Sequence, residues 1–461
     1  MNAWIEAERH AENATRLHEA GKWQEAMVEM RCALRVIPDR CEWHLALGST
    51  LDALGRYAEA AESYEQVLRL RGDDVPTLLL LGIDLLRSRL SRRAEQVLAR
   101  AAEIDPACEA SYCYRILAHA RLGEHDEAEQ MFYLARQIVD ECPRCYDHVA
   151  ASLFDNGNRE RAMWCWQRAL RIDPERTESR LNLARGLWQR GELHEAREQF
   201  TELLRRDPDD QHVLVELGRL LAAMGRRAEA TEKFQAALEI EPGLGAAHLG
   251  LGELAMRTGH LDAAEKSLGT AARLTPRLPV VYLRLAQLAN RRGDRSAARR
   301  MLRLELRRRG REVAHELEIA RMLLEHGMAH AVEPVVCDVL ERPEHQVGNE
   351  HVAAATLCRG VARMVQGRHH EGIADCRTVL RHTPGNWAAM QNLVIAYLRQ
   401  GQLNRAAYWL KQAMAVREGD AQLRALRRKL RRASWRSRVR RLGQHAAAVV
   451  RGLGQWWRSE A

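Results

Sequence analysis

The chain has 461 residues, of which 46% are hydrophobic and 29% are charged, as is ordinary for a soluble protein. It contains no run of about eighteen apolar residues and no apolar segment near its N-terminus. We therefore expect neither a membrane-spanning helix nor a secretory signal. The ten cysteines are irregularly spaced, unlike a disulfide framework. Together these features predict a cytoplasmic protein.

The formal net charge of +9 is concentrated at one end of the chain. Residues 421–461 hold twelve Lys or Arg and a single acid, Glu460, so this segment carries a charge of +11. Residues 1–420 are close to neutral, at about −2. Any partner attracted by overall charge is therefore expected at the C-terminal segment.

A repeating pattern is clearest in residues 211–244. Its marked positions are, in order, Gly218, Gly225, Ala230, Phe234, Ala237 and Pro242. Small residues allow two helices to cross closely, and Phe234 fills the gap between them. Gly225 is expected to end the first helix with a positive φ, which glycine adopts at low cost. Pro242 cannot continue the second helix. The segment therefore predicts a helix, a tight turn and a second helix.

The same pattern recurs every 34 residues. The twelve repeats begin at Ala7, Cys41, Val75, Glu109, Pro143, Thr177, Gln211, Gly245, Pro279, Val313, Ala353 and Trp387, and end near Asp420. The turn position is glycine in eleven of the twelve, and Arg89 is the exception. Six extra residues, 347–352, separate the tenth repeat from the eleventh.

This order of residues resembles the tetratricopeptide repeat (TPR), and the resemblance covers about nine tenths of the chain. It implies an all-α fold, a right-handed superhelical solenoid of about twelve 34-residue helix-turn-helix repeats over residues 7–420. Val332 and Pro334 depart from the repeat pattern close to the extra residues. We therefore expect bending or local opening within residues 313–352.

The C-terminal segment, residues 421–461, no longer follows the period. Leu423, Leu426 and Leu430 continue an apolar helical face, which predicts a capping helix. A basic tail with several tryptophans follows.

In TPR proteins the first helices of successive repeats line a concave groove. Transferred by position, this resemblance gives seven candidate contact residues: Arg185, Trp188, Arg219, Glu253, Gln287, Asn290 and Arg321. Arginines can bind carboxylates through two hydrogen bonds, and tryptophan can stack on a side chain. The pattern thus fits an extended, partly acidic peptide. It fits equally a solvated helix face with internal pairs, such as Arg219 with Glu253.

Two basic patches stand out. Four arginines spaced four apart lie within residues 291–311: Arg295, Arg299, Arg303 and Arg307. The tail contributes a second group: Arg436, Arg438, Arg440 and Arg441. The first patch could attract an acidic protein or nucleic acid, but it lacks the aromatic residues that stack on bases, so nucleic acid is the less favoured partner. The tail, with Trp435, Trp456 and Trp457, could lie on an anionic membrane surface or a partner protein, or could contact nucleic acid. The simplest alternatives are a solvated arginine-rich helix for the first and a disordered tail for the second.

The sequence contains no signature of an enzyme or a nucleotide site. The best metal candidate is Cys142-Pro-Arg-Cys145, a C-x-x-C pair. His148 follows three residues later, and Cys108 and Cys113 lie one repeat earlier. Zinc requires four ligands, and the sequence shows no second pair to complete the set. Buried packing of both cysteines is therefore favoured, and we expect no metal or other cofactor.

These observations predict a non-catalytic scaffold or adaptor that binds a protein or peptide in the groove. The alternative is a peripheral protein that anchors to a membrane surface or to nucleic acid through the basic tail.

Overall fold

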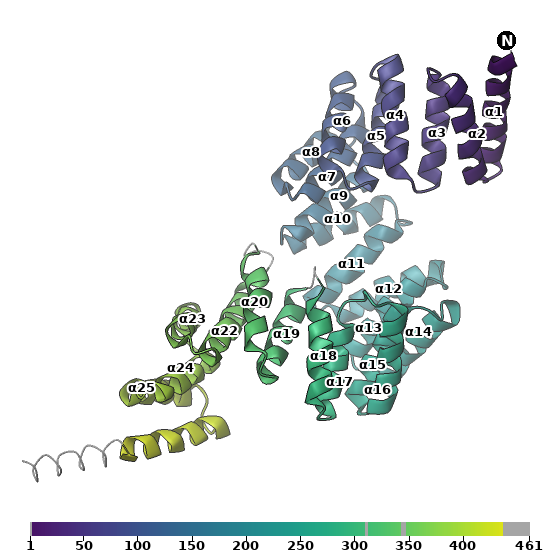
Figure 1. Cartoon of the computed structure of the whole chain (residues 1–461). Helices are drawn as coiled ribbons and strands as arrows, with labels where there is room; N and C mark the ends of the chain where they lie inside the picture. The colour runs from purple at the N-terminus through teal and green to yellow at the C-terminus, as the bar shows by residue number, and fades with distance from the viewer. Residues whose placement is uncertain (1, 309–311, 343–346, 437–461) are drawn as a thin grey trace, which may run out of the picture. The chain divides into compact units, whose positions relative to one another are not determined.

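The computed structural model describes residues 2–308, 312–342 and 347–436. Throughout these ranges helices alternate with short turns, and no strand occurs in them (Figure 1). The predicted all-α array of helix-turn-helix repeats is therefore confirmed. None of the helices in the described part combines the length and the apolarity that crossing a membrane requires.

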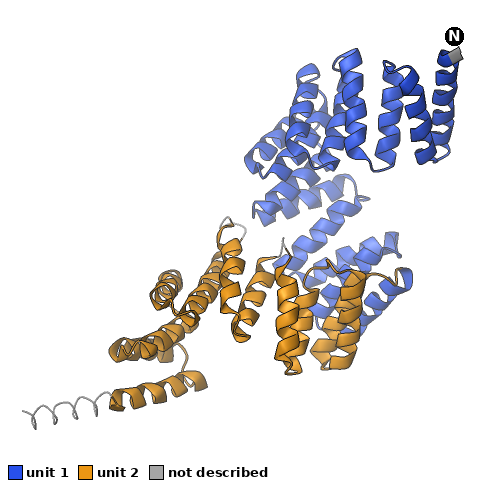
Figure 2. Ribbon diagram, in the orientation of Figure 1, with its two compact units in different colours: residues 1–240 blue, residues 241–461 orange. Residues whose placement is uncertain are grey.

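The chain divides into two compact units, Met1–Ile240 and Glu241–Ala461 (Figure 2). Unit 1 contains the first seven repeats, each built from an odd-numbered first helix and an even-numbered second helix. Its helices are α1 (Asn2–Glu19), α2 (Trp23–Val36), α3 (Cys41–Ala53), α4 (Tyr57–Arg71), α5 (Val75–Arg87), α6 (Ser91–Ile104), α7 (Glu109–Leu122), α8 (His125–Ile138), α9 (Pro143–Asp155), α10 (Arg159–Ile172), α11 (Thr177–Arg190), α12 (Leu193–Arg206), α13 (Gln211–Ala223) and α14 (Arg227–Ile240).

Unit 2 contains repeats eight to twelve and the C-terminal helix. Its elements are α15 (Gly245–Thr258), α16 (Leu261–Leu274), α17 (Val281–Arg291), α18 (Arg295–Leu306), α19 (Val313–Glu325), the 3₁₀ turn η1 (Ala329–Ala331), α20 (Val332–Leu340), α22 (Asn349–Val365), α23 (His369–His382), α24 (Trp387–Arg399) and α25 (Leu403–Val416). The hand of the superhelix and the bending of residues 313–352 stay predictions.

The turn position determines where each first helix ends. All eleven predicted turn glycines have a positive φ, between 71° and 88°. Arg89, the exception in the sequence, adopts the same conformation with a φ of 62°. The backbone therefore repeats even where the residue type does not.

Close helix crossing explains the small residues of the pattern. A Cβ atom added to Gly218 would lie 2.8 Å from the ring of Phe234, closer than real side chains approach. Phe234 and Ala230 are themselves almost completely buried. In this repeat the two helices thus pack closely against each other, as the sequence predicts.

Three helix starts differ from the predicted repeat boundaries. The first repeat begins at Asn2 rather than Ala7, so α1 is longer than the pattern predicts. The ninth repeat begins at Val281 rather than Pro279, because Val280 has a φ of 72°, outside the helical region. The eleventh begins at Asn349, directly after Gly348 with a φ of 74°. The last four of the six extra residues therefore lengthen α22 rather than forming a loop.

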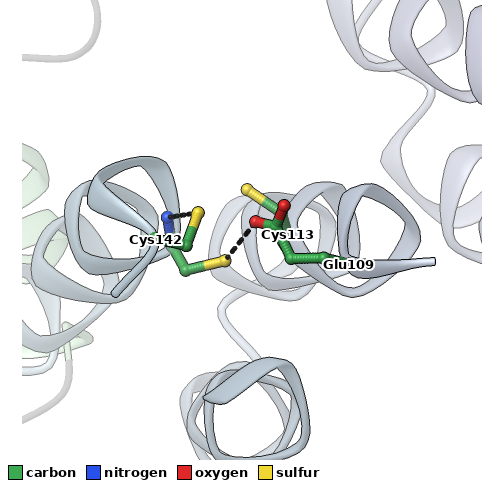
Figure 3. A group of neighbouring side chains, drawn as sticks. Glu109, Cys113 and Cys142 are labelled. Atoms are coloured by element: carbon green, nitrogen blue, oxygen red, sulfur yellow. Dashed lines mark hydrogen bonds between the residues drawn. The ribbon is translucent and has the colours of Figure 1, made fainter. Parts of the chain in front are cut away.

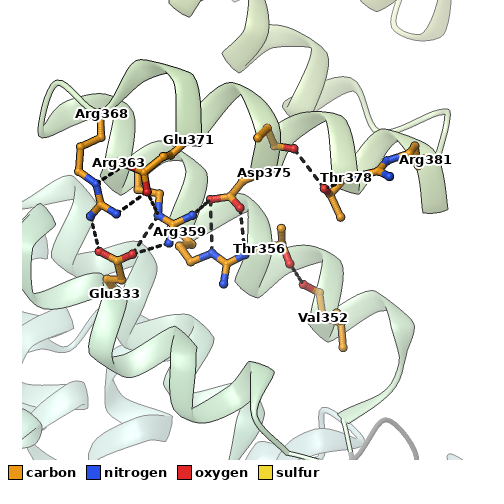
Figure 4. Close-up of polar contacts among 11 residues, drawn as sticks. Glu333, Val352, Thr356, Arg359, Arg363, Arg368, Glu371, Asp375, Thr378 and Arg381 are labelled. Carbon is orange, nitrogen blue, oxygen red and sulfur yellow. Dashed lines mark hydrogen bonds and ion pairs between the residues drawn. The ribbon is translucent and has the colours of Figure 1, made fainter.

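A network of ion pairs connects α20, α22 and α23 beside the extra residues (Figure 4). Glu333 accepts hydrogen bonds from Arg363 at 2.6 Å and from Arg368 at 2.7 Å. Arg363 also reaches the buried Asp375 at 3.0 Å. Pro334 lies in the first turn of α20, where its missing N–H is tolerated. The joint between repeats ten and eleven is thus held by charged groups as well as by apolar packing.

Residues 421–436 are helical and cover the end of the array. Leu423 is fully buried and Leu426 nearly so, in a cluster with Val394 of α24 and Leu410 of α25. This confirms the predicted capping helix.

Candidate functional site

In unit 1, the first helices α11 and α13 present three of the predicted contact residues. Glu216 on α13 is the shared neighbour of the two arginines. Its Oε1 atom lies 3.4 Å from Arg185 Nη2 and 3.9 Å from Arg219 Nη1. The two arginine side chains are 46% and 34% exposed. Trp188, also on α11, is half-buried. One carboxylate therefore contacts two guanidinium groups, and both contacts are long for an ion pair.

Unit 1 also has an open hollow of about 790 Å³ that the sequence did not predict. Charged side chains of both signs line most of it, including Arg180, Arg197, Glu202, Arg205, Glu229 and Lys233. Most of these residues belong to the second helices α12 and α14. The TPR resemblance predicts contact residues on first helices only, so it does not identify these positions.

In unit 2, the predicted residues Glu253 and Gln287 accept hydrogen bonds from Arg284, a residue that the sequence does not predict as part of the site. Arg284 on α17 donates to Glu253 of α15 at 2.5 Å and to Gln287 at 3.1 Å. It also donates to Glu318 of α19 at 2.9 Å, and Gln287 donates to the same carboxylate. This part of the first-helix face therefore satisfies its polar groups internally.

Arg219 and Glu253, the example of an internal pair, each have a partner within their own unit. Arg219 lies near Glu216, and Glu253 is bound by Arg284. Residues three apart on one helix share a face, which places Glu216 beside Arg219 on α13. The remaining candidates in unit 2, Asn290 on α17 and Arg321 on α19, are both exposed.

The first basic patch lies on α18 and at its end. Arg295, Arg303 and Arg307 are exposed. Arg299 is exposed as well, and its Nε donates to the carbonyl oxygen of His326 at 2.9 Å. In the tail, Arg436 is the last described residue. Three residues of the tail patch lie outside the described residues: Arg438, Arg440 and Arg441.

The C-x-x-C pair has two further neighbours (Figure 3). Glu109 and Cys113 of α7 join Cys142 and Cys145 at the start of α9, and the four ligand atoms all lie within 4.8 Å of one another. The Cys145 N–H donates to Cys142 Sγ at 3.3 Å, and Cys145 Sγ donates to Glu109 Oε1 at 3.5 Å. Cys113 lies one repeat before the pair, as the sequence indicates, and Glu109 is a further neighbour that the sequence analysis does not identify.

Hydrogen bonding within this group separates the three thiols. Bonds from Cys113 and Cys145 hold the pKa of Cys142 well below its usual range. Hydrogen bonds with Cys113 and Cys142 hold the pKa of Cys145 above its usual range, and a hydrogen bond with Cys142 does the same for the pKa of Cys113. Burial raises the pKa of Glu109. The group therefore favours one thiolate, on Cys142, at the N-terminus of α9.

Comparison with known protein families gives one consistent result. Four family models, each described as tetratricopeptide repeat, match this chain. The matched residues are 44–74, 79–143, 150–211, 181–244, 221–277, 279–303 and 364–430. A search of curated proteins finds no match.

Solved structures of similar fold are distant in sequence. The APC/C hetero-tetramer Cut9–Hcn1 is 16% identical, covers 91% of this chain and 95% of its own, and has a TM-score of 0.45. Yeast Tom70 is 15% identical, with coverages of 94% and 96% and a TM-score of 0.37. YrrB, described as a TPR protein with an unusual peptide-binding site, is 19% identical, with coverages of 37% and 88% and a TM-score of 0.32. These likenesses concern the fold alone.

Proposed function

Because this chain belongs to the tetratricopeptide repeat family, we propose that it is a non-catalytic scaffold that binds a partly acidic protein segment along α11 and α13. The repeat fold is typical of protein–protein interaction scaffolds. The finer assignment, to the first-helix face of repeats six and seven, rests on the side chains of those two helices.

The single observation that supports this face is the sharing of Glu216 by Arg185 and Arg219. At 3.9 Å the contact to Arg219 is an ion pair without a hydrogen bond, and the contact to Arg185 at 3.4 Å is long. Each guanidinium has five N–H donors. Within the described residues, the ion pairs of Arg185 and Arg219 are both made with Glu216. Both therefore keep donors for the carboxylates of a ligand.

The corresponding face of unit 2 is a weaker candidate. Arg284 lies between two carboxylates and an amide, so a ligand would first have to break these hydrogen bonds. We therefore assign Glu253 and Gln287 to internal support rather than to ligand contact.

Binding at α11 and α13 would gain from preorganisation. Helices packed in a repeat array hold their side chains at fixed spacing. Most of the conformational entropy lost on binding is therefore lost by the ligand. Trp188 adds apolar surface one turn from Arg185 on the same helix, where a ligand aromatic ring or aliphatic chain could pack.

Fluorescence anisotropy with short labelled peptides tests this proposal. The probes contain acidic and aromatic residues, and matched probes carry amides in place of the acids. Charge-assisted hydrogen bonds contribute about 1.5–3 kcal/mol each, so Arg185→Ala/Arg219→Ala should weaken binding of the acidic peptides by at least about tenfold. Arg100→Ala/Arg161→Ala is the control, because these second-helix arginines are 47% and 49% exposed. Equal binding by both double variants would refute the assignment.

The alternative function acts through the tail. Trp435 is 67% exposed near Arg431, Arg432 and Arg436, a combination suited to an anionic membrane surface or to nucleic acid. Truncation after residue 430 removes these residues and keeps Leu423, Leu426 and Leu430, which cap the array. If the tail is the active segment, full-length protein should bind anionic vesicles or a DNA duplex at low salt and lose them at high salt, and the truncated protein should bind neither.

A further inference from the structure

We propose that this chain binds one zinc ion between its fourth and fifth repeats. The four ligands are Glu109, Cys113, Cys142 and Cys145. The proposal is independent of the scaffold function, because it rests on the side chains that α7 and α9 bring together (Figure 3).

The spacing of the ligand atoms suits a single small ion. All four atoms lie within 4.8 Å of one another. In a tetrahedral zinc site with Zn–S bonds of about 2.3 Å, the sulfur atoms are about 3.8 Å apart. Binding would therefore draw the most distant of these atoms together by about 1 Å. Two of the ligands, Cys113 and Cys145, are each 1% exposed, and the other two are half-buried. An ion can therefore reach the group from the side of Glu109 and Cys142.

Each helix contributes its ligands through regular local structure. Glu109 and Cys113 lie four residues apart on α7, so one helical face presents both. Cys142 is the N-cap of α9, and Cys145 follows within the first turn. The positive end of the helix dipole favours anionic sulfur at these two positions. The ion would thus join the first helices of two consecutive repeats.

The ligand types select the metal. Thiolates prefer zinc and other soft or borderline ions over magnesium and calcium, which require oxygen ligands. Three thiolates and a carboxylate fill all four positions of a tetrahedron, which is typical of a structural site rather than a catalytic one. Arg144 carries a positive charge close to Glu109 and Cys142 and offsets part of the excess negative charge. Its guanidinium is held above the ring of Tyr114, 5.6 Å from the ring centre.

Simple packing explains this group less well than it explains the other cysteines. Cys376 shows the ordinary case: it is fully buried, and burial raises its pKa to about 12. In contrast, three of the ten cysteines meet here around a carboxylate. A disulfide between Cys142 and Cys145 would use two of the four groups and would give no role to Cys113 or Glu109.

The first test is zinc titration of the reduced, full-length protein after treatment with a chelator, with a competing chromophoric chelator as the reporter. We expect one zinc ion per chain at this site. Cys113→Ser should weaken that binding by at least about tenfold, since even supporting residues of metal sites change affinity by such factors. The matched control is Cys376→Ser, which replaces an equally buried thiol and should bind zinc as the wild type does.

Cobalt substitution provides a second measurement that does not depend on stability. Bound Co²⁺ should give thiolate-to-cobalt charge-transfer absorption together with the visible bands of a tetrahedral site. The half-buried Glu109→Gln variant keeps all three sulfurs, so it should retain the charge-transfer absorption and bind the ion more weakly. Circular dichroism shows whether each variant is folded.

Three results would overturn the proposal. One is the absence of stoichiometric zinc in the reduced wild type. Another is zinc binding that Cys113→Ser leaves unchanged in a folded protein. The third is a wild-type cobalt spectrum without thiolate charge transfer.

Discussion

Arg89 provides a direct test of the claim that backbone conformation, not residue type, defines the turn. Its φ of 62° lies in the left-handed region, which costs a non-glycine residue roughly 1–2 kcal/mol. Its side chain is exposed, and its N–H donates to the carbonyl oxygen of Leu86 at 3.0 Å, a bond that glycine can keep. Arg89→Gly removes the strain but adds unfolded-state entropy worth about 0.5–1 kcal/mol. We therefore expect the free energy of unfolding to rise by about 0.5–1 kcal/mol.

Hydrogen exchange is the appropriate assay, because a repeat array can open locally and need not unfold in one step. Protection of the amides in α5 and α6 should increase in Arg89→Gly. The reciprocal control is Gly123→Ala, at a turn glycine with a φ of 75° and no atom within 4 Å of the added Cβ. It should lower protection in α7 and α8 by about 1 kcal/mol. Reduced protection in Arg89→Gly would refute the reasoning.

Two further predictions concern buried charges. Burial, together with the nearby Asp52, raises the pKa of Asp84 from 3.8 to about 7. The folded state therefore holds the proton more tightly, so this contribution to stability is complete below pH 3.8 and is lost as the pH rises through about 7. Asp84→Asn should raise the melting temperature at about pH 8 and change it little near pH 4, and an equal shift at both would contradict this assignment. Arg363→Met removes an ion-pair partner from Glu333 and from the buried Asp375, so it should lower the free energy of unfolding by about 1–3 kcal/mol. Hydrogen exchange of the amides in α20, α22 and α23 measures this change, and unchanged protection would show that the network adds no stability.

The fold could be predicted almost completely from the sequence, because its determinants are local. A glycine at the turn, a small residue at the crossing and an aromatic residue between the helices act within one repeat. Gly218, Gly225 and Phe234 have the environments that the pattern indicates. The exceptions arise where a single residue changes the backbone, as Val280 does before α17.

The candidate sites were harder to predict, because their contacts join different repeats. Arg185 meets Glu216 across 31 residues, and Cys145 meets Glu109 across 36. Transferring positions from the TPR pattern identifies which side chains face outward, but not which of their neighbours bind them. Comparing residues about one period apart would have found both contacts, because stacking places the first helices of consecutive repeats side by side.

The most direct test of the proposed scaffold function is quantitative affinity capture from cell lysate, followed by mass spectrometry. Wild-type protein is compared with Arg185→Ala/Arg219→Ala and with the control Arg100→Ala/Arg161→Ala. If α11 and α13 form the binding face, the proteins captured by the wild type should persist with the control and be lost with the first variant. If the first variant captures the same proteins in the same amounts, the binding surface lies elsewhere and the central claim is wrong.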